Sequence, residues 1–104
     1  MADRYDKLLT DYFKGTLDKH VASYEVSGWF LEAHRDEYDD VKRVSLIVDN
    51  VVYDTLTTFY QNVFKDKYGD IMTFYDLHTT FDRTPTAIRK QKYKVKRKLK
   101  EAGL

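Results

Sequence analysis

Residues that break helices are scarce in this chain. One Pro and four Gly interrupt 104 residues, and between them apolar residues recur at spacings of three and four. This spacing matches the repeat of an α-helix, because it places the apolar side chains on one face. The sequence therefore predicts an all-α fold of five to six helices. The length predicts one domain over residues 1–104.

The first two predicted helices are delimited by glycines. The first should cover residues 3–14 and stop at Gly15, because glycine readily adopts the left-handed conformation that ends helices. Thr16 is the predicted cap of the second helix, and Gly28 should interrupt that helix. The apolar positions that give both helices a buried side are Tyr5, Leu8, Leu9, Tyr12, Leu17, Val21, Tyr24 and Phe30.

An acidic stretch precedes the third predicted helix. Residues 36–40 (DEYDD) suit a loop that leads into a helix N-terminus, where the helix dipole stabilises carboxylates. The helix itself is expected over residues 39–53. The β-branched run 44–52 (VSLIVDNVV) is also compatible with a strand. We favour a helix, because no turn signal or partner strand flanks the run. Its apolar positions at helical spacing are Val41, Val44, Val48 and Val51.

Threonines mark the next helix starts. Thr57 or Thr58 is expected to begin a fourth helix, which residues 67–70 (KYGD) should end. Thr73 and Asp76 have the spacing of a capping box at the start of a short fifth helix. The apolar positions of these two helices are Phe59, Tyr60, Val63, Phe64, Phe74, Leu77 and Phe81.

The last helix has the clearest start signal. Thr84 is a favourable N-cap, and Pro85 follows at the first helical position, where its fixed φ suits a helix and its missing N–H costs nothing. The helix should extend to Ala102, with Gly103 beyond its end. It follows the preceding short helix after a turn of three or four residues, which is helix-turn-helix spacing.

Charge is distributed very unevenly along the chain. Residues 83–104 hold nine of the 18 basic residues and one of the 17 acidic residues, a net charge of +8, whereas residues 1–82 carry −7. A basic segment on an acidic body is expected to seek polyanions through that segment alone.

The last helix should have two distinct sides, because successive residues are rotated by about 100°. The predicted buried side consists of Ile88, Gln91, Val95, Leu99 and Ala102. The outer face opposite consists of Thr86, Lys90, Tyr93 and Arg97. The outer face is flanked by Arg89, Lys94 and Lys100. Two lysines, Lys92 and Lys96, fall nearer the buried side and would have to extend past the core.

These features predict a DNA-binding helix. An α-helix fits the major groove, its first turns contact base edges, and later Lys or Arg side chains neutralise phosphates. We expect Thr86, Arg89 and Lys90 to contact bases. Lys94, Arg97 and Lys100 should anchor phosphates. Tyr93 could equally stack on DNA or pack on a neighbouring helix. The complete predicted DNA-binding set is Thr84, Thr86, Arg89, Lys90, Tyr93, Lys94, Arg97 and Lys100.

Residues 73–99 (TFYDLHTTFDRTPTAIRKQKYKVKRKL) resemble the helix-turn-helix of bacterial sigma factors, called region 4, which binds the −35 promoter element. The positions that carry the resemblance are Thr73, Leu77, Phe81, Asp82, Thr84, Ile88, Arg89, Lys94, Arg97, Lys98 and Leu99. The chain has no room for the sigma domain that melts the −10 element. As a free-standing region 4 it is similar to phage transcriptional regulators of the ArpU and RinA type, and residues 8–18 (LLTDYFKGTLD) add a weaker similarity.

Two residues depart from the sigma pattern. His78 stands where the pattern has a small residue that lets the two helices approach, and Arg83 stands where it usually has an apolar residue. The helices are therefore either spaced more widely than usual, or these two side chains point outward.

Other chemistries find little support in the sequence. The three histidines, His20, His34 and His78, lack metal-ligand spacing, and the acids of residues 36–40 lack the enclosed pocket that acid–base catalysis needs. No phosphate loop, nucleophile motif or cofactor fingerprint is present. There are no cysteines. We therefore expect no enzyme activity, no cofactor and no metal.

The partners and location follow from the same features. No stretch is long and apolar enough to span a membrane, and residues 1–9 lack the apolar run of a signal peptide, so a cytoplasmic protein is expected. Residues 55–104 should form the DNA-binding part. Residues 1–54 should form a helical body whose aromatic residues are candidates for a contact with RNA polymerase or a second copy.

The leading hypothesis is a sequence-specific, phage- or prophage-encoded transcriptional regulator that binds double-stranded DNA. One alternative is a phage DNA-packaging or replication accessory protein that uses the same helix-turn-helix. Another is a protein-interaction module whose basic helix docks on an acidic partner.

Overall fold

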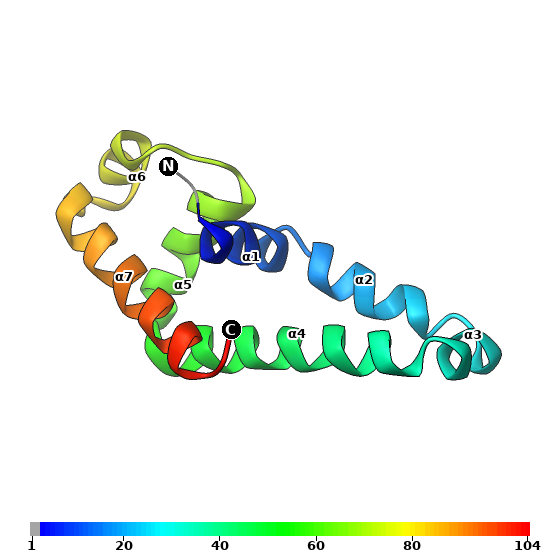
Figure 1. Cartoon of the computed structure of the whole chain (residues 1–104). Coiled ribbons are helices and arrows are strands. Elements are labelled where there is room, and N and C mark those ends of the chain that lie inside the picture. Colours follow the sequence, from blue (N-terminus) through cyan, green and yellow to red (C-terminus); the bar gives the residue numbers. More distant parts are fainter. Residues whose placement is uncertain (1–2) are drawn as a thin grey trace.

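The computed structural model describes residues 3–104, and within them it is all-α, without a strand (Figure 1). The fold class is as predicted, but seven α-helices and a π-helical turn replace the five to six helices expected. The elements in chain order are α1 (Arg4–Phe13), α2 (Thr16–Tyr24), α3 (Gly28–Ala33), α4 (Arg35–Thr55), α5 (Thr58–Phe64), η1 (Lys65–Gly69), α6 (Phe74–Phe81) and α7 (Pro85–Glu101).

The additional helix arises at the predicted interruption. Ser27 has an extended backbone, and its Oγ accepts the N–H of Phe30 at 3.1 Å, so it starts α3 as a separate helix. The predicted cap of α2 is wrong: Gly15, at φ 79°, occupies the N-cap position without a side-chain bond, and Thr16 is already helical. A left-handed backbone at this position suits glycine because it lacks a Cβ.

Helix α4 is longer than predicted. The acidic residues 36–40, expected in a loop, form its first turns. The helix dipole stabilises their carboxylates at the N-terminal end of α4. In addition, Arg35 pairs with Asp39 at 3.5 Å, and Arg43 pairs with Asp40 at 3.1 Å. The strand alternative for the β-branched run 44–52 is also wrong, since the whole run is helical.

The helix after Thr57 ends within residues 67–70, as expected, but its last five residues form a π-helical turn. Thr57, one of the two predicted starts, is the N-cap of α5. Helix α5 then continues directly into the π-helical turn η1. The wider turn keeps Tyr68 buried. A Cβ at Gly69 would lie 3.3 Å from the carbonyl oxygen of Phe13, so glycine permits the close approach of α1.

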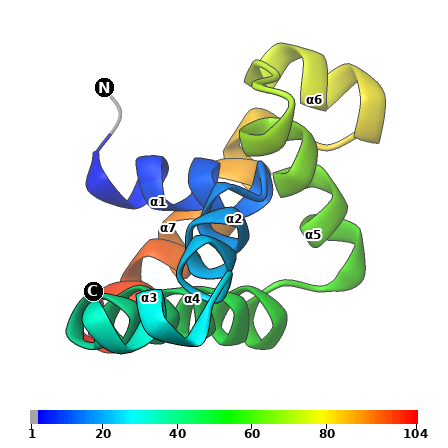
Figure 2. The same cartoon turned by 90° about the vertical axis from the view of Figure 1, so that its right-hand side faces the viewer.

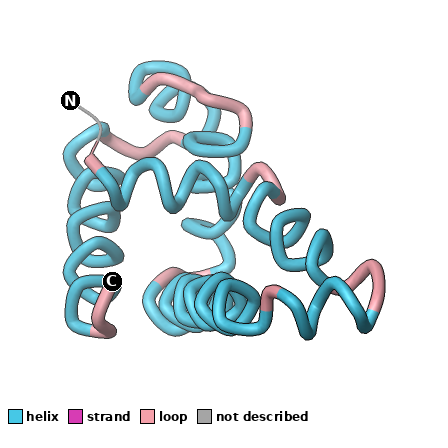
Figure 3. The backbone as a smooth tube through the Cα atoms, turned by 45° about the vertical axis from the view of Figure 1, so that its right-hand side comes forward, coloured by secondary structure: helices cyan, strands magenta, loops and turns pink. Residues whose placement is uncertain are grey.

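The molecule is elongated, with principal extents of 49 × 26 × 26 Å. We call one part the arm: α2, α3 and residues 35–45 of α4, which lie together at one end of the molecule (Figure 1) and face the viewer in Figure 2. The rest is the head: α1, residues 46–55 of α4, α5, η1, α6 and α7. Short loops join the helices in both parts (Figure 3).

The core lies in the head. Its most deeply buried side chains, all at most 1% exposed, are Leu9, Val48, Val63, Phe64, Leu77, Ile88, Val95 and Leu99. Because α1 packs on η1 and α4 packs on α7, both halves of the sequence contribute to this core.

A polar cluster joins the first helix to the last. The Lys96 ammonium lies 2.9 Å from Asp6 Oδ2 and 3.2 Å from Asp3 Oδ2, and Tyr68 donates its hydroxyl to Asp6 at 2.9 Å. Lys96 therefore does not extend past the core to water, as the sequence suggested, because carboxylates meet it there.

Candidate nucleic-acid interface

The start of α7 is built as predicted. Thr84 is the N-cap, and its Oγ accepts the N–H of Ala87 at 3.1 Å, while Pro85 is the first helical residue. The preceding helix α6 begins with the predicted capping box of Thr73 and Asp76. Residues 82–84 join the two helices, and Asp82 takes a left-handed backbone at φ 52°.

The side of α7 that faces the core is close to the predicted one. Ile88, Val95 and Leu99 are buried, and Gln91 is half-buried. Ala102 is the exception, since it is exposed and lies beyond the last helical residue, Glu101. Helix α7 ends there because Gly103 turns the chain at φ 93°.

The two residues that depart from the sigma pattern point outward. His78 and Arg83 are both exposed. The Nδ1–H of the His78 ring donates a hydrogen bond to the backbone oxygen of Arg83 at 2.9 Å, and the Arg83 guanidinium lies 4.6 Å from the centre of the Phe59 ring. The packing of α6 on α7 is left to Leu77 and Ile88, both buried.

The structure brings together the four residues of the predicted outer face. Thr86, Lys90, Tyr93 and Arg97 are all exposed along α7. Tyr93 is 62% exposed, so it does not pack into a neighbouring helix of this chain. A shallow hollow of about 340 Å³ runs along this face between Lys90, Tyr93, Lys94 and Arg97.

The flanking residues lie in three different settings. Arg89 turns toward α6, with its guanidinium 4.7 Å from the centre of the Phe74 ring. Lys94 borders a hollow shared with the C-terminal end of α4, where Thr55 also lies. Lys100 and the cap residue Thr84 are exposed. Thr84 accepts a capping bond but keeps a hydroxyl proton to donate.

Few carboxylates neutralise α7. Within residues 3–104, the ion pairs of its outer face and flanks are those of Arg97 and Lys98 with Glu101, at 3.9 and 3.6 Å. Both pairs are exposed, and exposed pairs are weak. The only other ion pair of α7 in this part of the chain is that of Lys96 with Asp3 and Asp6. The remaining cations are available for an external polyanion.

The cluster around Lys96 fixes where α7 lies. Burial alone would raise the pKa of Asp6, but hydrogen bonds from Lys96, the Asp3 backbone and Tyr68 outweigh it and lower this pKa to about 2. Burial and the bond to Asp6 raise the pKa of the Tyr68 hydroxyl. The charged form of Asp6 is therefore the one the fold uses, and it holds α7 against α1.

Sequence reasoning missed one basic residue near this interface. Lys67 lies on η1, and its ammonium is 4.5 Å from the centre of the Phe74 ring. Lys92 of α7 is 5.3 Å from the same centre. No spacing in the sequence connects Lys67 with α7, because the two segments meet only through the tertiary fold.

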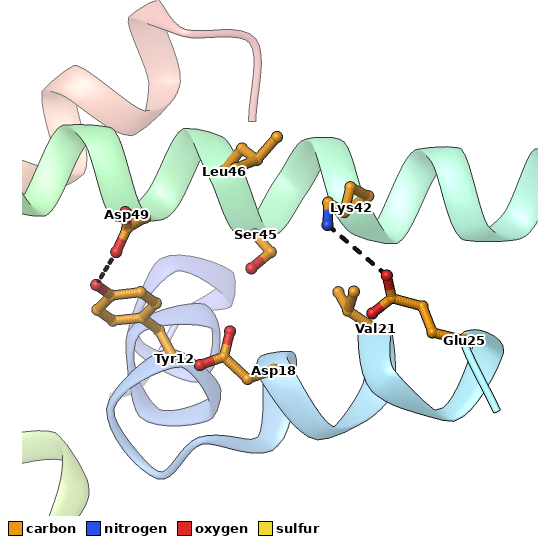
Figure 4. A pocket seen from close by; sticks show the side chains of 8 residues that line it. All are labelled: Tyr12, Asp18, Val21, Glu25, Lys42, Ser45, Leu46 and Asp49. Atoms are coloured by element: carbon orange, nitrogen blue, oxygen red, sulfur yellow. Dashed lines mark hydrogen bonds and ion pairs between the residues drawn. The ribbon is translucent and has the colours of Figure 1, made fainter.

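A third hollow lies between α2 and α4, away from the basic face (Figure 4). It measures about 340 Å³ and is bordered by Asp18, Glu25 and Asp49 among others. Tyr12 donates to Asp49 at 2.5 Å, and burial together with this bond raises the pKa of the Tyr12 hydroxyl. Within residues 3–104, no group of three or more His, Cys, Asp or Glu side chains could hold a metal ion.

No protein-family model, curated protein or solved structure matches this chain. No helix of the described residues has the length and apolar character needed to cross a membrane.

Proposed function

We propose that the protein binds double-stranded DNA through α7 and acts as a sequence-specific transcriptional regulator of a phage or prophage. The observation that carries the proposal is the exposed, largely unpaired row of cations on a capped helix whose opposite side is buried. A helix held in this way presents its charges in a fixed register, which suits a duplex groove.

The arrangement of α6 and α7 supports a helix-turn-helix. Three residues separate the two helices, their buried contact is apolar, and the side chains that depart from the sigma pattern lie outside that contact. The resemblance of residues 73–99 to sigma region 4 points the same way. It also supplies the transcriptional and phage parts of the proposal.

The exposed residues receive distinct roles. Thr86 and Lys90, in the first two turns of α7, contact base edges. Lys94, Arg97 and Lys100 neutralise phosphates, while Thr84 donates to one and Tyr93 stacks on the backbone or donates to it. Arg89 turns toward Phe74, so we assign it to phosphate and leave Lys90 as the main base contact.

Salt titration of duplex binding tests the proposal. Contacts with about six phosphates predict a slope near −5 in a plot of log binding constant against log salt concentration. Absence of binding at low salt would exclude the DNA-binding function and leave docking on an acidic protein as the alternative.

Single substitutions test the assigned roles. Arg97→Ala should weaken binding to all sequences equally and reduce the salt slope by about one, whereas Lys90→Ala should cost about 1–3 kcal/mol mainly on the preferred site. The preferred site can be selected from a pool of random duplexes. Equal losses on all duplexes for both variants would remove the base-contacting role of Lys90.

A further inference from the structure

Three cationic side chains from two separate segments gather around one aromatic ring. The Lys67 ammonium of η1, the Arg89 guanidinium and the Lys92 ammonium of α7 lie 4.5, 4.7 and 5.3 Å from the centre of the Phe74 ring. No two of them can therefore be farther apart than about 10 Å, which is one Debye length at 0.1 M salt. Their mutual repulsion is only partly screened.

Within residues 3–104 this repulsion is relieved only in part, through the nearby charge of Asp6. Over residues 3–104, none of the three cations forms an ion pair with a carboxylate. Asp6 borders the same hollow, but its carboxylate is already bonded to Lys96 at 2.9 Å and to Tyr68 at 2.9 Å. Burial, and then the charge of Lys92, lowers the pKa of the Lys67 ammonium.

The ring orients these charges without neutralising them. The negative face of an aromatic ring attracts cations, but each such contact contributes only about 0.5–2 kcal/mol. Lys67, Lys92 and Phe74 border an open hollow of about 310 Å³ together with Thr10 and Tyr68. An anion placed there would lower the repulsion between the cations.

We propose that Lys67, Arg89, Lys92 and Phe74, here called the Phe74 cradle, bind a phosphodiester group of the nucleic-acid backbone beside the groove that α7 enters. This inference rests on the proposed DNA binding. It assigns a phosphate contact to η1, a segment outside the helix-turn-helix. A nucleic-acid strand is the favoured source of the phosphate, because Arg89 joins the cradle directly to the exposed face of α7.

Removal of the Lys67 charge tests the cradle in the full-length chain. Lys67→Gln should weaken binding to a random-sequence duplex and reduce the salt slope by about 0.9, the value for one phosphate contact. Lys19→Gln removes the same charge from the exposed surface of the arm and should leave the slope unchanged. Lys67→Arg keeps the charge and should restore the wild-type slope.

The outcomes separate the two proposals. A wild-type slope for Lys67→Gln, with DNA binding intact, would overturn the cradle and leave the proposed function in place. If the wild-type protein binds no duplex, the proposed function fails. Titration with inorganic phosphate, followed by NMR of the Phe74 ring, then tests the anion site. Saturable shifts in the wild-type protein that disappear in Lys67→Gln would support the site. Absence of shifts in the wild-type protein would overturn it.

Discussion

The head buries eight side chains to 1% exposure or less, whereas the arm's most buried apolar residues, Leu17 and Val21, remain 8% and 7% exposed. Near the end of the arm, Val26 and Trp29 are 81% and 78% exposed. Both parts consist of helices of ordinary amphipathic sequence. They differ in how many neighbours surround each helix, because α1, α4, α5, α6 and α7 meet in the head, whereas α2 packs on α1 and α4, and α3 packs on α4.

Surface interactions supplement the few buried residues of the arm, Leu17 and Val21. The Tyr24 ring lies 5.8 Å from Phe30 and 6.2 Å from Tyr38, and each aromatic pair of this kind contributes about 0.5–1.5 kcal/mol. Tyr24 donates to Glu37 at 3.2 Å, and Tyr38 donates to Glu25 at 3.0 Å, both in exposed positions. We therefore expect the arm to open more readily than the head, which carries the proposed DNA-binding face.

The largest expected effect is the loss of a central ring from the head. Phe64→Ala should cost about 3–5 kcal/mol of unfolding free energy, because Phe64 is fully buried and the cavity cannot collapse fully. Trp29→Ala in the arm removes a larger ring and should change stability by no more than about 0.5 kcal/mol. Chemical denaturation compares the two variants. Similar losses would show that the arm is as well packed as the head.

An intermediate effect is expected from the polar cluster between α1 and α7. Asp6→Asn should cost about 1–3 kcal/mol, because it leaves the Lys96 ammonium, only 14% exposed, with a weakened partner. Asp11→Asn is the matched control on the same helix, since Asp11 pairs with Lys7, which is 78% exposed. That pair should contribute at most about 1 kcal/mol. Equal losses of stability in the two variants would contradict the role of Asp6 in holding α7 against α1.

Acidification should remove the contribution of Asp6 to the free energy of unfolding. The fold lowers the pKa of Asp6 from 3.8 to about 2, so its contribution is complete above the unfolded pKa and is lost as the pH falls toward the folded one. The stability difference between the wild-type protein and Asp6→Asn should therefore be constant near neutral pH and shrink below about pH 4. A difference independent of pH down to 2 would show that the charge of Asp6 is not what stabilises the contact.

The smallest effect expected is the loss of the α7 cap. Thr84→Ala should cost about 1 kcal/mol, because the N–H of Ala87 loses its partner. Thr86→Ala is the matched control, because it makes the same substitution inside the helix and should leave the stability nearly unchanged. Thermal unfolding measures both, and an unchanged melting temperature for Thr84→Ala would contradict the capping role.

Local signals in the sequence predicted several helix starts correctly, because the deciding interactions there are local, although the cap of α2 was assigned to Thr16 in place of Gly15. Thr73 with Asp76 and Thr84 with Pro85 act within one turn, so they marked α6 and α7 correctly. Residues 36–40 were misassigned because carboxylates favour both a loop before a helix and the first turn of one. The π-helical turn at Lys65–Gly69 could not be anticipated, since it depends on the fit of Tyr68 and Gly69 against α1.

For the candidate interface too, the sequence predicted what local periodicity determines and missed what tertiary contacts determine. Helical periodicity was enough to predict that Thr86, Lys90, Tyr93 and Arg97 lie on one exposed face. The positions of Lys96 and Lys67 could not be predicted in this way, because their neighbours come together only in the tertiary fold. Lys96 contacts Asp3 and Asp6. Lys67 lies near the Phe74 ring, which Lys92 also approaches. Whether a lysine is exposed or engaged inside the fold depends on these tertiary contacts.

The most direct test of the central claim is NMR mapping of duplex binding on the full-length protein at low salt. We expect amide shifts along the exposed side of α7 and at the start of α6, with unchanged signals from α2 and α3, and we expect these shifts to weaken as salt is added. Shifts confined to the arm, or no shifts at any duplex concentration, would contradict the assignment of α7 as the DNA-binding surface.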